Sequence, residues 1–379
     1  MAGDTQPSLG IARSAKRISR KMRESAKMAQ FRLACALAFE KKFSALNGKD
    51  REHAISGIER TGIKPDNAKG TRITASKEDI AFFDRQAGKF MESVKSWGLV
   101  ELYLGALFGR VSRLQEGARV FPCLEEGNCV MLNFMQITGK DSEASFEFMA
   151  GKDCKSSYAC LNLVEMAACA SARLGLAKSN EGKTGLSVVS KIIIGESAHA
   201  HIDTWEFGSG DITAVTTAEL AGAGATCELN GAFFGFGKAD FSIDTSAFSM
   251  KKDTKSAIAA KGALDDSAKC DYSGILDVGA KAAGSATDFR EKVLMLSGNA
   301  ASFSVPSLDI RNNDITAGHG AAAGKIGEDE LFYLKSRGIS EDMAKGMVAR
   351  GFLHEPLSKM GERHRKLFEG RLATRLGDI

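Results

Sequence analysis

His319 is the residue with the clearest chemical potential in this sequence. It lies in the run GHGAAAG, residues 318–324, where only small side chains surround the imidazole. An imidazole can bind iron through one ring nitrogen, and its second nitrogen then needs a hydrogen-bond partner. Small neighbours would let a metal centre or a partner's backbone come close. The alternative is a histidine that only forms a hydrogen bond at a subunit interface.

Two further groups could supply metal ligands. His199 and His201 are two residues apart on an expected strand, so both side chains point to the same face. They form either half of a metal site or part of a solvent-exposed face, since no acid or cysteine has a fixed spacing to them. Glu291 could offer an oxygen ligand to iron, or could be a surface carboxylate that pairs with Arg290 or Lys292.

The cysteines do not form a recognisable metal motif. None stands in a C-x-x-C pair, which argues against a zinc ribbon or a ferredoxin-type cluster. A chain of this kind with no signal peptide is expected in the cytosol, with reduced thiols. Cys227 lies in an expected β region, where its thiol is either a candidate ligand or a buried inert side chain. The full set is Cys35, Cys123, Cys129, Cys154, Cys160, Cys169, Cys227 and Cys270.

Composition and charge narrow the functional classes. A chain of 379 residues can form two or three domains, and no apolar run is long enough to predict a transmembrane helix. Basic residues gather between Arg13 and Lys27, as in a helix for a membrane, a nucleic acid or organelle targeting. The helical pattern continues unbroken to Phe39, which favours an ordinary solvated helix. The run ending in Gly-Lys325 resembles a phosphate loop, but its glycines are out of register and Ile326 replaces the required hydroxyl.

Hydrophobic periodicity divides the chain into three regions. Residues 1–108 are helical in pattern, with two long helices expected near 11–46 and 77–108. Residues 109–326 alternate apolar and polar side chains in short stretches, and residues 327–379 are helical again. The short stretches are separated by similar Gly-Ala or Ser-Ala turns, which predicts a parallel β-helix. A β-sandwich is the alternative, although its hairpins would favour Asn-Gly or Asp-Gly turns.

The C-terminal region is expected to contain a helical hairpin. Acidic residues at 328–330 suit the start of a helix. Gly338 suits the C′ position after that helix, and Ser340 suits the N-cap of the next one. A final basic helix is expected to begin at Pro356.

Several motifs, in order along the chain, resemble a known family. Residues 305–353 include VPSLDI, then HGA, then GKIGEDELFYLKSRGI. Residues 261–276 (KGALDDSAKCDYSGIL) and residues 293–297 (VLMLS) fit two further stretches of the same pattern. The chain resembles the SufB/SufD family, the scaffold proteins of the SUF iron–sulfur cluster assembly system. The likeness is strong from about residue 190 to 353 and moderate from 109 to 190.

The resemblance implies a right-handed parallel β-helix core flanked by an N-terminal helical region and a C-terminal helical hairpin. Two such subunits would pair through their β-helices, and each would bind one SufC-type ABC ATPase. The scaffold itself would not hydrolyse ATP, and an Fe–S cluster would be bound only transiently. In this chain the ATPase-binding hairpin would lie at 327–353, with contacts from Phe332, Tyr333, Arg337, Met347 and Phe352.

The site residues of the family match this chain only in part. His319 matches the interface histidine of the H-G-A segment, and Cys227 is a candidate for relaying persulfide sulfur. SufD-type members often have a cysteine where this chain has Ala317, and SufB-type members have a glutamate where it has Gly320. SufB-type members also have a cysteine at the position of Glu291. The cluster candidates are therefore His319, Cys227 and Glu291, without the thiolates of an obvious ligand set.

The sequence thus predicts a cytoplasmic, non-enzymatic scaffold subunit that binds SufC and pairs with a second SufB/SufD-type subunit, either a copy of itself or a paralogue. No nucleic-acid partner and no membrane insertion are expected. One alternative is a carbohydrate-active enzyme on a β-helix, which would need converging carboxylates and stacking aromatic residues. Another is a purely architectural SufD-like partner with no cluster ligand of its own.

Overall fold

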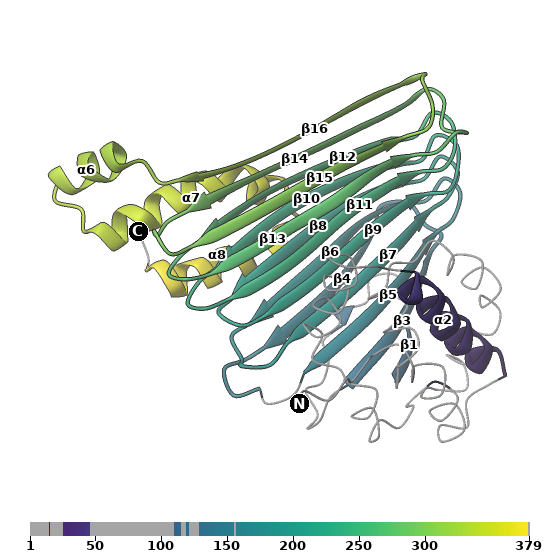
Figure 1. Ribbon diagram of the computed structural model, residues 1–379, viewed down its shortest axis with the longest axis horizontal. Coiled ribbons are helices and arrows are strands. Elements are labelled where there is room, and N and C mark those ends of the chain that lie inside the picture. Colours follow the sequence, from purple (N-terminus) through teal and green to yellow (C-terminus); the bar gives the residue numbers. More distant parts are fainter. Residues whose placement is uncertain are drawn as a thin grey trace.

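The computed structural model describes residue 15 and residues 26–45, 110–114, 119–120, 129–154 and 157–377 (Figure 1). In the N-terminal region, helix α2 (Ala26–Ser44) falls within the first helix that the sequence predicts. The second predicted helix, near 77–108, and most of the basic segment 13–27 lie outside the described residues.

The centre of the molecule consists of strands that wind into a parallel β-helix. Odd-numbered strands form one eight-stranded sheet and even-numbered strands form another, each in chain order. We call these the odd sheet and the even sheet. The strands are β1 (Arg110–Leu114), β2 (Arg119–Val120), β3 (Cys129–Ile137), β4 (Ser142–Ala150), β5 (Tyr158–Met166), β6 (Ser171–Asn180), β7 (Leu186–Ile194), β8 (His199–Gly208), β9 (Ile212–Leu220), β10 (Thr226–Gly235), β11 (Asp240–Ser249), β12 (Lys255–Leu264), β13 (Lys269–Val278), β14 (Ser285–Met295), β15 (Ala301–Ile310) and β16 (Ile315–Lys325).

Parallel pairing decides between the two architectures that the sequence allowed. Each strand pairs in parallel with the strand two places further along the chain, as β8 does with β10 from His199↔Thr226 to Gly208↔Gly235. A hairpin-based sandwich would pair consecutive strands in antiparallel fashion. The prediction of a parallel β-helix is therefore confirmed.

The recurring small-residue turns have a common physical reason. An alanine stands directly before the strand at many corners, and its methyl group is buried between neighbouring coils, where a larger side chain would not fit. A left-handed backbone precedes several of these alanines, as at Ser197 and Asp266 (both φ 53°). The corner alanines are Ala170, Ala198, Ala225, Ala239, Ala268 and Ala300, all at most 7% exposed.

Three helices follow the β-helix: α6 (Glu328–Ser336), α7 (Glu341–Lys359) and α8 (Glu362–Leu376). Ser340 caps α7 as predicted, because its side chain accepts a hydrogen bond from the Met343 amide. Gly338 has φ 84°, as its C′ position requires. The expected start of the last helix at Pro356 is wrong: Pro356 lies inside α7, and the chain turns only at Gly361. The helix continues past the proline because Pro356 and Leu357 are buried against the even sheet.

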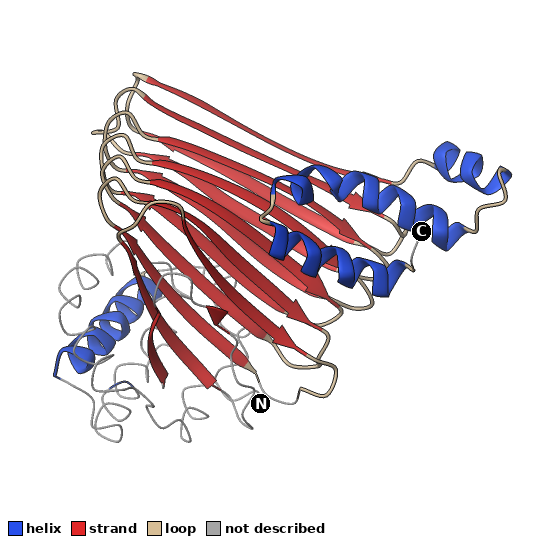
Figure 2. Cartoon of the chain, turned by 180° about the vertical axis from the view of Figure 1, so that it is seen from behind, coloured by secondary structure: helices blue, strands red, loops and turns tan. Residues whose placement is uncertain are grey.

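α7 and α8 lie side by side on the outer face of the even sheet, whereas α6 extends beyond the strands (Figure 2). Their apolar residues form a second core with the outer side chains of the sheet. Phe368 of α8 contacts Trp205 and Phe207 edge-on, with ring centroids 5.6 and 5.9 Å apart. Within the described residues, no helix is long and apolar enough to cross a membrane.

Candidate functional site

The last coil of the β-helix, made of β15 and β16, is more exposed than the strands β4 to β14 before it. Each strand is the last of its sheet, so one of its edges pairs with no other strand in the described residues. Phe303 and Val305 on the outer face of β15 are 66% and 43% exposed. We call β15 and β16 the terminal coil.

His319 lies in the middle of β16, in the terminal coil. In the register with β14 it stands beside Phe289, whose ring faces the interior of the β-helix and is 1% exposed. Partners in a parallel register point to the same side, so His319 faces the open end of the interior. The imidazole is exposed, and a ligand or a second chain can reach it.

Glu291 is not the surface carboxylate that the sequence suggested as the simpler reading. It lies on β14 with 1% exposure, and its Oε2 accepts a hydrogen bond from the Ser304 hydroxyl across the interior at 2.7 Å. The expected partner Arg290 bonds instead to Asp288 on the outer face. Burial raises the pKa of Glu291 above its ordinary value, although the bond from Ser304 opposes the shift.

The interior beneath the terminal coil contains polar atoms without partners. Glu291 Oε1 and Ser302 Oγ are buried and have no hydrogen-bond partner in the described part of the chain. Buried polar atoms in folded proteins are nearly always paired, and these two unpaired atoms lie beside the open end of the interior. Glu291 and His319 lie on neighbouring strands. The register partner of Glu291 is Ala321, two residues after His319, so the Cα atoms of Glu291 and His319 are roughly 8 Å apart.

The two candidate ligands do not make a complete metal site. In the described residues no group of three or more His, Cys, Asp or Glu side chains could hold a metal ion. Ala317 and Gly320 leave the neighbouring positions on β16 without side-chain donors. An imidazole and a carboxylate suit iron, but further ligands would have to come from a second subunit or from sulfide.

Cys227 lies far from these residues. Its row in the even sheet continues through Ser256 and Thr287 to Ala317, so three strand spacings, roughly 14 Å, separate it from β16. Burial raises the pKa of its thiol to about 12, and the nearby charge of Glu228 adds to this. Such a thiol is inert at neutral pH. The nearer thiol is Cys270 on β13, beside Ser302 in the register; burial raises its pKa too, and no motif in the sequence distinguishes it.

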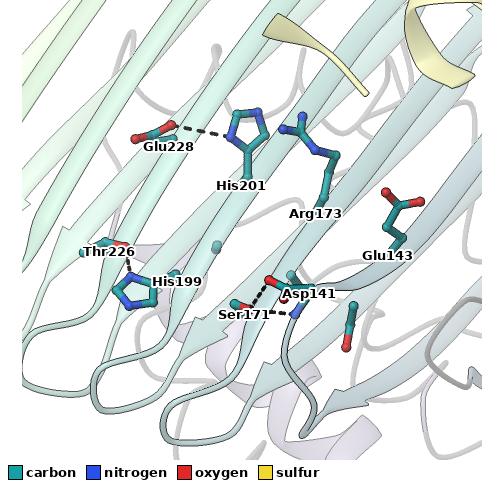
Figure 3. Close-up of a pocket in the computed structure, with 11 residues that line it drawn as sticks. Asp141, Glu143, Ser171, Arg173, His199, His201, Thr226 and Glu228 are labelled. Atoms are coloured by element: carbon teal, nitrogen blue, oxygen red, sulfur yellow. Dashed lines mark hydrogen bonds and ion pairs between the residues drawn. The ribbon is translucent and has the colours of Figure 1, made fainter. Parts of the chain in front are cut away.

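His199 and His201 lie on the outer face of the even sheet, in a shallow groove beside the turn between α7 and α8 (Figure 3). His199 Nδ1 lies 2.6 Å from the Thr226 hydroxyl. His201 lies between two carboxylates, 3.1 Å from Asp203 and 3.5 Å from Glu228. The second of these acids was not expected, because it comes from the neighbouring strand. The side chains form a ladder of opposite charges on the sheet rather than a convergent metal site.

The predicted ATPase-binding residues fall into two groups. Phe332 and Tyr333 on α6 are 74% and 57% exposed, and the Arg337 guanidinium lies 5.3 Å from the centre of the Tyr333 ring. Met347 and Phe352 on α7 are half-buried, and Phe352 packs against the core between α7 and the even sheet. Met343, which the sequence reasoning missed, is 46% exposed at the start of α7.

A comparison with protein families decides the assignment. A family model described as "SUF system FeS cluster assembly, SufBD core domain" matches residues 125–352. This chain belongs to the SufB/SufD family. The match covers the β-helix from β3 onward together with α6 and most of α7, the elements that carry His319, Glu291 and the exposed aromatic residues of α6.

Curated relatives of this SufB/SufD chain match over shorter stretches. An iron–sulfur cluster assembly SufBD family protein of Mycobacterium leprae is 37% identical over 110 residues, 29% of this chain and 12% of that protein. The iron–sulfur cluster assembly protein SufB of Bacillus subtilis is 36% identical over 110 residues, 29% of this chain and 23% of that protein. The aligned stretches thus span about an eighth to a quarter of these relatives.

Proposed function

We propose that this SufB/SufD chain is a scaffold subunit for iron–sulfur cluster assembly, and that it pairs with a second SufB/SufD-type subunit through its terminal coil. The observation that carries this proposal is the open end of the β-helix. Among the residues that the structure describes, an exposed imidazole, a buried carboxylate with one unpaired oxygen and two unpaired strand edges meet there.

The edge of β16 supports pairing with another chain. Free edges in natural proteins are usually blunted by charges, prolines or bulges, because an unpaired row of backbone groups is a template for further strands. β16 runs ITAGHGAAAGK, so its first charged residue is Lys325 at the very end. The small side chains leave the backbone accessible along ten residues, and Phe303 and Val305 beside it offer apolar surface.

The same geometry supports transient binding of a cluster at the seam. His319 of each subunit would supply one nitrogen ligand, and Glu291 an oxygen ligand. The remaining ligands would come from the partner. A subunit whose partner supplies every ligand would be the purely architectural alternative, and the iron content of the isolated pair separates the two.

The exposed face of α6 is the proposed dock for a SufC-type ATPase. α6 buries none of its residues, so its aromatic side chains do not serve the fold of this subunit. Adjacent exposed Phe332 and Tyr333 have the character of the aromatic anchors that dominate protein interfaces. With ATP hydrolysis assigned to this partner, the scaffold itself needs no catalytic site.

A carbohydrate-active enzyme remains the weaker reading. Such an enzyme needs carboxylates that converge in one groove with stacking aromatic residues. In the groove of Figure 3, Glu228 is paired with His201, and no aromatic side chain lines the described walls. Within the described residues, Cys35, Cys169, Cys227 and Cys270 form no disulfide, which fits the proposed cytoplasmic location.

The docking proposal is tested by co-expressing the chain anaerobically with the SufC-type ATPase of the same organism. Phe332→Asp with Tyr333→Asp should weaken the complex by roughly 30-fold or more, because losing an interface anchor costs about 2 kcal/mol. Met250→Asp is the matched control, since Met250 is 43% exposed at a remote turn. Native mass spectrometry measures both the affinity and the stoichiometry. Unchanged binding of the double variant would rule out α6 as the dock.

A further inference from the structure

A continuous chain of hydrogen bonds fastens α8 to the even sheet, and His364 is at its centre. The Trp205 indole N–H donates to His364 Nδ1 at 3.0 Å, and His364 Nε2 lies 2.9 Å from Ser145 Oγ. The Ser145 hydroxyl donates to Glu147 at 2.7 Å, and the Arg363 guanidinium donates to the other oxygen of that carboxylate at 2.8 Å. The chain of bonds thus begins on β8, passes through His364 of α8 to β4, and returns to α8 at Arg363.

The direction of these bonds determines which form of His364 fits. An indole nitrogen is a donor only, so Nδ1 must accept and cannot carry a proton. The Ser145 hydroxyl uses its hydrogen toward Glu147, so it accepts from the proton on Nε2. The neutral Nε2–H form of His364 satisfies every bond. A second proton on Nδ1 would point directly at the indole N–H.

The imidazole has no room to turn away from this contact. His364 is 6% exposed and Trp205 is fully buried. The ring lies directly over Gly175, where an added Cβ would lie 1.8 Å from Nε2. A protonated ring must therefore leave its seat, and α8 would move with it.

The charged groups around His364 come from every neighbouring element. Glu147 on β4 and Asp203 on β8 favour the protonated ring, whereas Arg363 on α8 and Lys178 on β6 oppose it. Burial has the largest effect, and the pKa of His364 lies below its ordinary value. Hydrogen bonds hold the pKa of Glu147 and of Asp203 below their ordinary values despite burial, so both carboxylates keep their charge at pH 5.

We propose that His364 is a proton-sensitive latch, which holds α8 against the even sheet while the ring is neutral and releases it when the ring is protonated. A second link would lose its anchorage with it: Asp203 accepts from the Gly361 amide at 2.8 Å, directly before α8. Release would also free the Gly377 carbonyl at the end of α8, which accepts a hydrogen bond from Arg350 of α7, while α7 itself stays packed on β10 and β12. Any effect of this on a docked ATPase rests on the proposed docking role of α6.

Hydrogen–deuterium exchange of the full-length chain tests the latch, with α8 compared against β8 and β10 as an internal reference. Between pH 7.5 and pH 5.0, the protection of α8 corrected for intrinsic exchange should fall by up to about 30-fold, the limit for a group with an unfolded pKa near 6.5. The strands should keep their protection. No ATPase is present in this measurement, so failure of the latch and failure of the docking proposal are distinguishable.

Two variants and a control make the result specific. His364→Gln should reduce the pH dependence of α8 to less than twofold, while His354→Gln, at an exposed histidine of α7, should behave as the wild type. Trp205→Phe removes the opposing donor and should also reduce the pH dependence, which provides a second test if the glutamine variant does not fold. A wild-type α8 whose protection is unchanged at pH 5.0 would overturn the proposal. So would a pH dependence that persists in both variants.

Discussion

Replacing Glu291 by glutamine should stabilise the protein at neutral pH, although it removes a charged residue from a proposed functional site. The carboxyl group is buried beneath the terminal coil, and its pKa is raised above the ordinary value. Because its pKa is higher in the folded chain than in the unfolded chain, the Glu291 carboxyl holds its proton more tightly in the folded state as the pH rises past 4.5. Stability therefore falls as the pH rises through this range, which is the cost of ionising Glu291 inside the β-helix.

The magnitude follows from the unpaired oxygen. One oxygen of Glu291 is bonded to Ser304 and the other has no partner in the described residues. A buried polar atom without a partner costs roughly 1–3 kcal/mol, and more when it is charged. Glutamine has the same shape and can still accept from Ser304, and its NH2 group is as unpaired as the oxygen it replaces, but it carries no charge. Only the extra cost of the charge is removed, so Glu291→Gln should gain about 1 kcal/mol at pH 8 and nothing at pH 4.

Thermal unfolding followed by circular dichroism at pH 4 and pH 8 measures this difference. In a domain of this size each kcal/mol moves the Tm by roughly 2–4 °C. Glu228→Gln is the control: the Glu228 side chain is 75% exposed on the outer face, and its replacement should leave the Tm unchanged within about 1 °C. If Glu291→Gln lowers the Tm at pH 8, or shifts it equally at both pH values, then the carboxylate stabilises the fold and the reasoning above is refuted.

Two further outcomes are expected. Gly175→Ala should destabilise the packing of α8 on the even sheet by roughly 1–3 kcal/mol or more, the cost of overpacking, because the new methyl group would overlap the His364 ring. Gly320→Ala is the matched control, since nothing lies within 4 Å of the added carbon. Equal losses of stability for the two variants in urea unfolding would contradict the packing argument. The Cys227 thiol should resist iodoacetamide at pH 8 in the folded protein, because its pKa is raised to about 12, whereas the exposed Cys169 should react. Mass spectrometry of peptides measures both reactions, and it would show labelled Cys227 if this residue were an accessible sulfur relay.

The fold could be predicted because its signals are local. Many corners of the β-helix repeat a small residue before the next strand, and only a stack of closely spaced coils requires this of so many turns. Ser340 and Gly338 also follow rules that depend on a few neighbouring residues. Pro356 was misread because prolines usually mark helix starts, and the apolar residues around it pack against strands more than 100 positions earlier.

The candidate site could be predicted only in part. His319 was recognisable from its motif, but Glu291 was read as a surface residue because charged residues stand on either side of it. Strand alternation contained the correct signal: Phe289, Glu291 and Val293 are in phase, so the acid shares the interior face with two apolar side chains. The partners of His364 are 159 and 219 residues away in sequence, and no local pattern indicates them.

Contacts between neighbouring coils join residues close in sequence, whereas contacts between α8 and the even sheet join residues far apart. This difference bears on how the molecule folds during synthesis. Side-chain contacts between neighbouring coils join residues about one coil apart, 29 residues in the pair Asn133–Asn162. A spacing of roughly 30 residues in a chain of this length corresponds to a relative contact order near 0.08, the range of fast-folding helical bundles. Each coil can therefore form as soon as the next has left the ribosome. The contact between Glu147 and Arg363 spans 216 residues, so α8 can attach only long after the strands that it covers have formed, and a nascent β-helix exposes the outer face of its even sheet until α7 and α8 have been made.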